Sequence, residues 1–145
     1  MTKWTLRDVA EKIRDIDFAM LLTVAPGGAV TGRPMSNNRD VEYDGGSYFF
    51  TTEDADSVAH IENHSQVALS YAGSKGLLGK PPAFIAVQGE AELIRDRARF
   101  EAHWNKDLER WFAQGVDTPG LVLLKVHARR IHYWDGTDEG EIVVG

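Results

Sequence analysis

The chain has 145 residues, of which 43% are hydrophobic and 26% are charged, and its formal net charge is −6. These values are typical of a single globular domain spanning residues 1–145, long enough to bury a core. The acidic balance argues against nucleic acid or anionic membranes as partners. With no cysteine, disulfides, thiolate metal sites and a cysteine nucleophile are excluded. No run has the apolar character of a signal peptide or membrane helix, so we expect a cytoplasmic protein.

The N-terminal half predicts short elements joined by turns. Thr5 and Asp8 resemble a capping box, with Asp in place of the usual Glu or Gln, and apolar residues follow at helical spacing. Further on, strand-like runs alternate with the turns Pro26-Gly27-Gly28 and Asp44-Gly45-Gly46. The expected elements are a helix at 5–15, strands at 18–25, 29–36 and 47–52, a helix at 55–63 and a strand at 66–71.

The C-terminal half predicts two long strands separated by a helix. The expected elements are a loop at 73–82, a strand at 83–94, a helix that begins after Asp96, a loop at 115–120 and a strand at 121–134. Gly89 favours a bulge in the first strand, and the second is expected to bend near Ala128-Arg129. No element is predicted for the acidic tail from Gly136. The apolar side of the helix comprises Phe100, Trp104, Leu108, Trp111 and Phe112.

The number and order of these elements predict the fold class. About six strands follow one another through short turns, which indicates an antiparallel sheet. Six antiparallel strands with few helices usually close into a small barrel, because closure removes exposed edges. We therefore expect a mainly β protein, a six-stranded barrel with peripheral helices.

The strand at 29–36 carries the first candidate for a ligand site. Alternation places Thr31, Arg33 and Met35 on one face. Pro34 cannot donate to a ladder, so this strand is expected at an edge or at a bulge. In one interpretation, Arg33 binds an anionic group and the backbone that follows lies along a flat ring. In the other, Arg33 is an exposed edge arginine that opposes aggregation.

The strand at 47–52 carries the second candidate. Phe49 and Phe50 cannot face the same side, so one should enter the core and the other could flank a ligand. The hydroxyls of Thr51 and Thr52 are donors suited to phosphate or ribityl oxygens. An ordinary strand of residues with high β-propensity is the competing interpretation.

Two further positions sit at the ends of predicted elements. Ser57 lies at a helix N-terminus, where free backbone N–H groups favour anions, although a simple helix cap is the competing interpretation. Trp134 ends the last long strand, where an indole can cover a flat ring or a subunit contact, or can pack in the core. By pattern alone, Trp111 on the second helix is a packing residue.

Other polar residues do not form a recognisable catalytic or metal motif. His60 and His64 have the i, i+4 spacing of zinc ligands but lack the H-E-x-x-H pattern, so we expect solvated surface histidines and no metal. Glu90 and Glu92 share a strand face and are expected to form an exposed acidic edge. No G-x-S-x-G nucleophile elbow is present, and no catalytic residue is assigned.

Taken together, these segments supply a cation, hydroxyls and flat apolar faces, the combination that flavin mononucleotide (FMN) requires. In their order and spacing they resemble the pyridoxamine 5′-phosphate oxidase-like superfamily of FMN-binding split barrels. Within it the chain is similar to the bacterial general stress proteins, over residues 5 to 136. The matching segments are Gly32-Arg33-Pro34-Met35, residues 47–52, Ile61-Glu62-Asn63, residues 87–91, Trp111-Phe112 with Gly115, and residues 131–135.

The resemblance implies a six-stranded antiparallel split barrel that forms a homodimer, with two FMN sites at the subunit interface. It implies that Arg33, Pro34, Met35 and Ser36 line the flavin, with Arg33 near the phosphate. Phe50, Thr51 and Thr52 would touch the ring edge and the ribityl chain. Trp134 would contact the flavin from the other subunit, and Trp111 is a further candidate contact.

The sequence departs from the family pattern in two places. The family usually carries lysine or arginine after the Phe-Thr strand, where this chain has Asp56-Ser57. Losing one charge-assisted hydrogen bond would weaken FMN about 10- to 100-fold. The helix N-terminus, Ser57 or Lys75 are the candidates to compensate. The second departure is the C-terminal Arg/His-containing segment that binds substrate in the vitamin B6 oxidases, which is not found here, so pyridoxamine phosphate oxidase activity is not expected.

The leading functional hypothesis is therefore an FMN-dependent oxidoreductase of unknown substrate. The alternatives are a non-catalytic flavin carrier or sensor in a stress response, and a split barrel that holds the deazaflavin F420 or haem. Turnover with NAD(P)H or a substrate would separate the enzyme from the carrier.

Overall fold

The computed structural model describes residues 3–37, 45–73 and 81–144. The strands are β1 (Phe18–Val24), β2 (Val30–Ser36), β3 (Gly46–Thr52), β4 (Gln66–Ala72), β5 (Phe84–Ile94), β6 (Leu121–Asp135) and β7 (Asp138–Val143). The helices are α1 (Leu6–Arg14), α2 (Asp56–Asn63), α3 (Arg97–His103) and the short 3-10 helices η2 (Lys106–Arg110) and η3 (Gly115–Asp117). Within these described parts, no helix is long and apolar enough to cross a bilayer.

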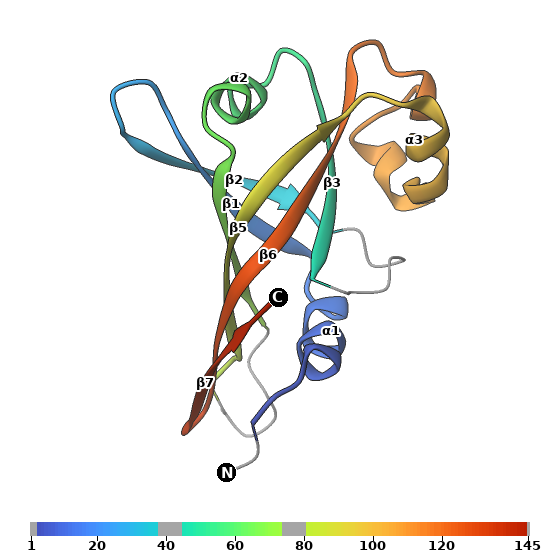
Figure 1. The fold of residues 1–145 in the computed structure, drawn as a ribbon. Coiled ribbons are helices and arrows are strands. Elements are labelled where there is room, and N and C mark those ends of the chain that lie inside the picture. Colours follow the sequence, from blue (N-terminus) through green and yellow to red (C-terminus); the bar gives the residue numbers. More distant parts are fainter. Residues whose placement is uncertain (1–2, 38–44, 74–80, 145) are drawn as a thin grey trace.

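All strand pairs are antiparallel, in the order β2-β1-β4-β5-β6-β3, with β7 paired to β6 (Figure 1). The mainly β, antiparallel class is therefore confirmed. The sheet has its two ends at β2 and β3, which are not paired with each other. The sheet is thus open along a seam between β2 and β3, and the prediction that β2 is an edge strand is correct.

The seventh strand corrects the expected count of six. The chain turns at Gly136, whose φ of 63° is a left-handed conformation that glycine adopts without strain. Asp135 and Asp138 then face each other at the start of the β6–β7 pair. The acidic tail gave no apolar alternation strong enough to predict this strand, which is fixed by pairing to β6.

The core has two parts, which lie on opposite faces of the sheet at β3 and β6. The larger part holds the inward residues of β1, β4, β5 and β6 together with Val9 and Ile13 of α1, whose predicted capping box between Thr5 and Asp8 is present. The smaller part lies between β3, β6 and the α3–η2 segment. Phe49 belongs to the first part and Phe50 to the second, so the two aromatics do face opposite ways.

The helix expected after Asp96 is shorter than predicted. It ends at His103, and Trp104 is extended with φ −71° and ψ 137°. Asn105 interrupts it, because its side chain accepts a hydrogen bond from Asp107 N at 2.9 Å and starts η2. The predicted apolar side still packs as one cluster, except that Trp111 is 55% exposed.

The long β5–β6 pair contains an irregularity at Gly89, as predicted, but its extra residue lies in β6 and not in β5. The register shifts at Gln88/Gly89, so that Gly89 faces Ala128 and Arg129 is the extra residue. A Cβ on Gly89 would lie 2.1 Å from His127 O, so only glycine fits this close approach. The predicted loop 73–82 and the turn at Asp44 lie largely outside the described residues, as does Lys75.

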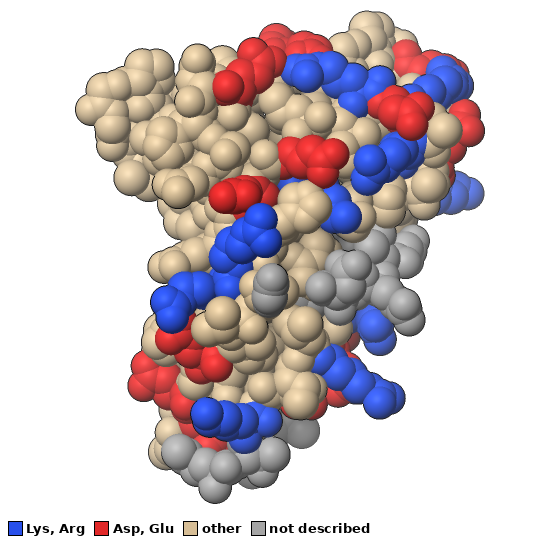
Figure 2. Space-filling view, viewed as in Figure 1, with Lys and Arg blue, Asp and Glu red and all other residues tan. Residues whose placement is uncertain are grey.

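The surface divides into a charged and an uncharged region. In Figure 2, Lys, Arg, Asp and Glu cover the helices and the lower part of the β5–β6–β7 ribbon, whereas the β1–β2 hairpin at upper left is free of them. The sequence from Phe18 to Gly32 contains no charged residue. Arg33 is therefore the one charged residue of the β1–β2 hairpin, and it lies on the strand that forms one edge of the open seam.

Candidate functional site

A cavity of about 530 Å³ opens at the seam between β2 and β3, beneath the N-terminus of α2. We call it the seam cavity. Its position follows from the topology, because β2 and β3 are the first and last strands in the strand order and do not pair with each other. It is lined by Thr31, Gly32, Arg33, Pro34, Met35, Thr51, Ala55, Asp56, Ser57 and His60.

Arg33 is half-buried at the seam cavity and tied to the β1–β2 hairpin. Its Nη1 donates to Leu21 O at 3.2 Å and to Thr23 Oγ1 at 2.8 Å, and its Nη2 donates to Thr31 Oγ1 at 2.6 Å. These three bonds leave two of the five guanidinium N–H donors for a ligand. Sequence reasoning expected an exposed side chain, so the bonds within the hairpin are a correction.

The charge of Arg33 is not neutralised by an ion pair within the described residues. Burial lowers the pKa of Arg33, and the nearby Asp56 charge raises it in part. An arginine stays protonated through such a shift at any physiological pH. The seam cavity therefore holds a permanent cation that is ready to bind an anion.

The N-terminus of α2 forms the opposite wall of the seam cavity. Ala55 is the N-cap residue and supplies no side-chain cap. Val58 N donates to Ala55 O at 3.1 Å, so the N–H groups of Asp56 and Ser57 are the first-turn donors left for a ligand. Ser57 is only 3% exposed and lines the cavity. Because Ala55 takes the cap position, Ser57 is not the helix cap that the competing interpretation required.

His60 belongs to the same wall, contrary to prediction. It is half-buried, and its Nδ1 lies 2.9 Å from Thr23 Oγ1, whereas His64 is exposed as expected. Its position could have been found from spacing, because residues three apart share a helix face and Ser57 was already a candidate. Thr23, 1% exposed, was missed because it sits in an otherwise apolar run.

The structure brings together five of the ten candidate cofactor ligands. Arg33, Pro34, Met35, Thr51 and Ser57 all line the seam cavity. Their grouping results from the strand order, since residues 33–35 and Thr51 lie on opposite edges of the seam.

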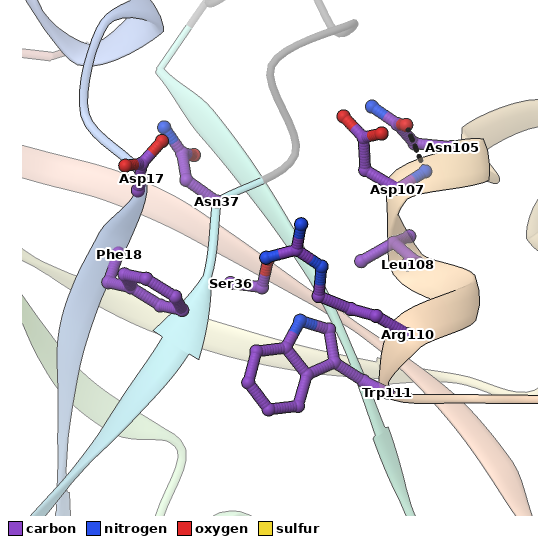
Figure 3. Close-up of a pocket in the computed structure, with 9 residues that line it drawn as sticks. All are labelled: Asp17, Phe18, Ser36, Asn37, Asn105, Asp107, Leu108, Arg110 and Trp111. Atoms are coloured by element: carbon purple, nitrogen blue, oxygen red, sulfur yellow. Dashed lines mark hydrogen bonds between the residues drawn. The ribbon is translucent and has the colours of Figure 1, made fainter.

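Ser36 and Trp111 line a second, smaller cavity of about 280 Å³ at the C-terminal end of β2 (Figure 3). Trp111 packs edge-on against Phe18, with ring centroids 6.3 Å apart. Arg110 and Asp107 of η2 line the same cavity. The flat, apolar part of this cavity is formed by the exposed rings of Phe18 and Trp111, which belong to different predicted elements.

The remaining candidates lie elsewhere. Thr52 donates a hydrogen bond to a carboxylate oxygen of Asp54. Phe50 is 6% exposed and packs edge-on against Phe100 and Trp104. Phe50 therefore lines neither cavity and contributes to the smaller core.

Trp134 lies on the outer face of β6, away from both cavities. It is 37% exposed and stacks on His132, with centroids 4.2 Å apart and planes at 6°. Its Nε1 donates to Glu139 Oε1 at 3.0 Å. One face of the indole is thus covered by the His132 ring.

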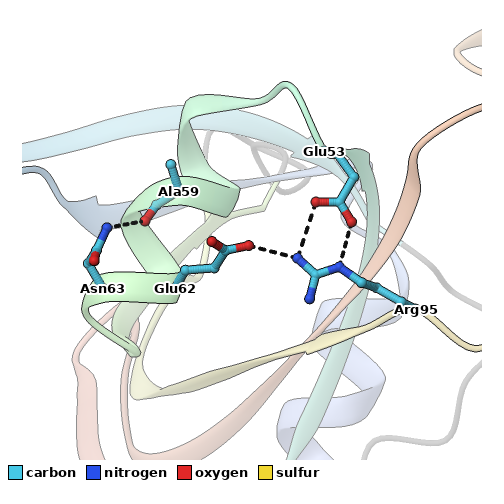
Figure 4. Close-up of polar contacts among 5 residues, drawn as sticks. All are labelled: Glu53, Ala59, Glu62, Asn63 and Arg95. Carbon is cyan, nitrogen blue, oxygen red and sulfur yellow. Dashed lines mark hydrogen bonds and ion pairs between the residues drawn. The ribbon is translucent and has the colours of Figure 1, made fainter.

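An ion-pair network at the end of β5 anchors the rim of the seam cavity (Figure 4). Arg95 Nη2 lies 3.1 Å from Glu53 Oε2 and 2.8 Å from Glu62 Oε1. These contacts raise the pKa of Arg95, and the hydrogen bond from Arg95 lowers the pKa of Glu53. The network ties the end of β3 to α2, the two elements that flank the opening.

The comparisons with known proteins define the class of this fold. Residues 5–145 match the family described as pyridoxamine 5′-phosphate oxidase like. The chain therefore belongs to that family, and the resemblance found in the sequence is confirmed. No match was found among the curated proteins.

Several solved structures have a similar fold. A Clostridium acetobutylicum protein related to general stress protein 26 of Bacillus subtilis superposes with a TM-score of 0.79 at 18% identity, covering 96% of this chain and 94% of that one. General stress protein 26 of Bacillus anthracis has a TM-score of 0.72 at 23% identity, covering 93% and 98%. A haem-binding protein of Mycobacterium smegmatis has a TM-score of 0.74 at 13% identity, covering 99% of this chain and 60% of that one. These likenesses confirm the split-barrel fold.

Proposed function

We propose that this protein binds FMN, with the phosphate and ribityl chain in the seam cavity. The observation that carries the proposal is the convergence of Arg33 and the uncapped N-terminus of α2 on one cavity. A phosphate is favoured by charge-assisted donors and by open helix N–H groups, and both are present at this point. The two unused donors of Arg33 suit the oxygens of a phosphate monoester.

The other ligands follow from the direction of β2. Pro34, Met35 and Ser36 lead from the seam cavity toward the cavity lined by Trp111. We assign the flavin ring to this stretch, where Pro34 leaves a ladder position without an N–H donor. Of the two candidate threonines, Thr51 lines the seam cavity and is assigned to the ribityl chain, whereas the Thr52 hydroxyl is engaged by Asp54. Phe50 is not included, because its ring is packed in the smaller core.

The same proposal includes a homodimer. The outer face of β1 is apolar at Phe18, Met20, Leu22 and Val24, and the first two are 47% and 41% exposed. A strand that is apolar on both faces is expected to be covered on both. A second copy of the chain would cover this face and would bring Trp134 of the partner subunit toward the flavin. Light scattering should then give twice the chain mass of 16.1 kDa, and a monomer at micromolar concentration would contradict the dimer.

When bound, FMN supplies one- or two-electron redox chemistry, and the protein contributes binding and orientation. Arg33 and the α2 N-terminus hold the phosphate end, and the apolar stretch after Arg33 covers the ring. This division suits an FMN-dependent oxidoreductase. A flavin carrier or sensor requires the same binding groups, so steady-state NAD(P)H oxidation separates the two. Repeated turnover supports the enzyme, and stable flavin without turnover supports the carrier.

The decisive experiment is the visible absorption spectrum of the purified protein, with the released cofactor identified by mass. Bound FMN, or stoichiometric uptake of added FMN, supports the proposal. The similarity to a haem-binding protein makes haem the first alternative, and F420 is the second. Either of these in place of FMN would overturn the cofactor assignment while keeping the seam cavity as the site to test.

A further inference from the structure

The seam cavity is short of positive charge for the ligand proposed to occupy it. A phosphate monoester carries between one and two negative charges at pH 7. Arg33 supplies one permanent positive charge, and Asp56 places a carboxylate on the same wall. The two charges offset each other in part, so a further cation within the cavity would strengthen phosphate binding.

His60 is positioned to supply that cation. It lies one helical turn after Ser57 on the same side of α2 and lines the seam cavity with Arg33. Its Nδ1 is engaged by Thr23 Oγ1 at 2.9 Å. The ring nitrogen left for a ligand is therefore Nε2.

The hydrogen-bond network accepts both charge states of His60. Thr23 Oγ1 accepts from Arg33 Nη1 at 2.8 Å and lies 3.4 Å from Thr31 Oγ1. With His60 neutral, the Thr23 hydroxyl donates to Nδ1. With His60 protonated, Nδ1–H donates to Thr23, whose own proton turns toward Thr31. Nε2 carries a hydrogen in the protonated state and in the neutral state in which Thr23 donates to Nδ1, and protonation adds the charge.

We propose that protonated His60 is a second cationic ligand of the flavin phosphate in the seam cavity, so that its contribution to FMN affinity grows as the pH falls from 8 to 6. This inference rests on the proposed binding of FMN. A histidine side chain changes charge within this range, and its charged form binds a phosphate more strongly than its neutral form.

The charged groups around His60 are few. Arg33 faces it from β2, and Asp56 precedes it on α2. β1 presents the Thr23 hydroxyl. On the β5 side, Arg95 is paired with two glutamates at the rim.

The test is a flavin fluorescence titration of the wild type, His60→Gln and His64→Gln with FMN and with riboflavin, at pH 6 and pH 8. His64→Gln is the matched control, because His64 is exposed on the same helix end and does not line the cavity. Riboflavin lacks the phosphate. The phosphate titrates in the same range, so the measured quantity is the ratio of variant to wild-type Kd at each pH.

We expect His60→Gln to weaken FMN about tenfold at pH 6, equivalent to about 1.4 kcal/mol, and less than about twofold at pH 8. His64→Gln should match the wild type, and riboflavin affinity should not change. His60→Lys, which keeps a cation at both pH values, should restore FMN binding and remove the pH dependence of the ratio.

The proposed binding of FMN and the proposed role of His60 are overturned by different results. If the wild type takes up no FMN at either pH, the proposed function is overturned and this inference with it. If the wild type binds FMN but His60→Gln binds it equally well at pH 6, only the role of His60 is overturned. An equal loss of riboflavin affinity in His60→Gln would also overturn it, because the effect would then not act through the phosphate.

Discussion

The β5–β6 pair and the β2–β3 seam are made from strands of one sheet, yet the side chains that they direct inward differ in polarity. Inward residues of β5, such as Ile85 and Val87, are at most 1% exposed and entirely apolar. The inward side of β2 instead presents Thr31 and Arg33, both half-buried. Where the sheet is continuous the interior is a hydrocarbon core, and where the sheet is open it holds a cation and hydroxyls.

This difference shows how the fold creates a polar site and still gives its charged residue hydrogen-bond partners. Burying a guanidinium in the middle of the sheet would cost several kcal/mol. At the seam, Arg33 keeps three hydrogen bonds to the hairpin and remains open to a ligand. Mutations in the two regions should therefore act on different properties, stability in one and binding in the other.

The largest effect is expected from Gly89→Ala in the β5–β6 pair. The added Cβ would lie 2.1 Å from His127 O and 2.9 Å from its carbonyl carbon. Both atoms are backbone, so the bulge itself must move. We expect a loss of about 3 kcal/mol in the free energy of unfolding in urea. Gln88→Ala, at the exposed preceding residue, should change it by less than about 0.5 kcal/mol, and equal stability of the two variants would contradict this account.

The second effect is expected at the apolar outer face of β1. Met20→Glu would place a carboxylate in the centre of the proposed dimer contact, where an unpaired charge is strongly unfavourable. We expect the dimer dissociation constant to rise by at least about 100-fold, or about 2.7 kcal/mol. Sedimentation velocity measures it. Ala102→Glu, on the exposed side of α3, adds the same charge away from β1 and should leave the dimer intact.

The third effect tests the seam itself. Arg33→Ala should weaken FMN about 10- to 100-fold, because a charge-assisted hydrogen bond is lost. Arg33→Lys should recover only part of this loss, since an ammonium cannot reproduce the fork that spans Thr23 and Thr31. Fluorescence titration gives the affinities, and circular dichroism checks the fold. Wild-type affinity in the alanine variant would remove Arg33 from the site.

The regions also differ in how far the sequence predicts them. In the strand at 83–94, apolar alternation and one glycine were enough to predict the strand and the position of the irregularity at Gly89, although its extra residue lies in β6. The break at Asn105 and the β7 strand were missed. The first depends on a side chain that competes with the helix, and the second on pairing with β6, which no local pattern records.

At the seam, the residues with a local signature were found, and those defined by pairing were not. Arg33 and Ser57 stand out by their position in a strand and at a helix start. The Thr23–Thr31 contact arises from the hairpin register, in which these two residues face each other. His60 joins them only because α2 packs over β1. The network therefore depends on three elements, and a single-sequence pattern of any one of them is not sufficient.

The smallest effect is expected from the ion pairs on the outer face of the β5–β6 pair. Glu92 lies 3.0 Å from His127 Nε2, and this hydrogen bond is the main reason why the pKa of Glu92 is lowered from 4.5. A lowered folded-state pKa stabilises the protein above the ordinary carboxyl pKa, and this contribution disappears as the pH falls through the folded-state value. Because the Glu92 side chain is 49% exposed, solvent screening reduces the gain to well below about 1 kcal/mol.

Thermal unfolding of Glu92→Gln against the wild type should therefore show a slightly lower Tm at pH 7, and this difference should shrink as the pH falls below the ordinary carboxyl pKa. Glu101→Gln, on α3, is a control for removing an exposed carboxylate elsewhere. A loss at pH 7 as large as that of Gly89→Ala would mean that surface charge rather than the packed bulge holds β5 against β6. The small effect expected here means that the β5–β6 pair is stabilised mainly by its apolar inner face. Charge is important mainly at the seam, where it serves binding.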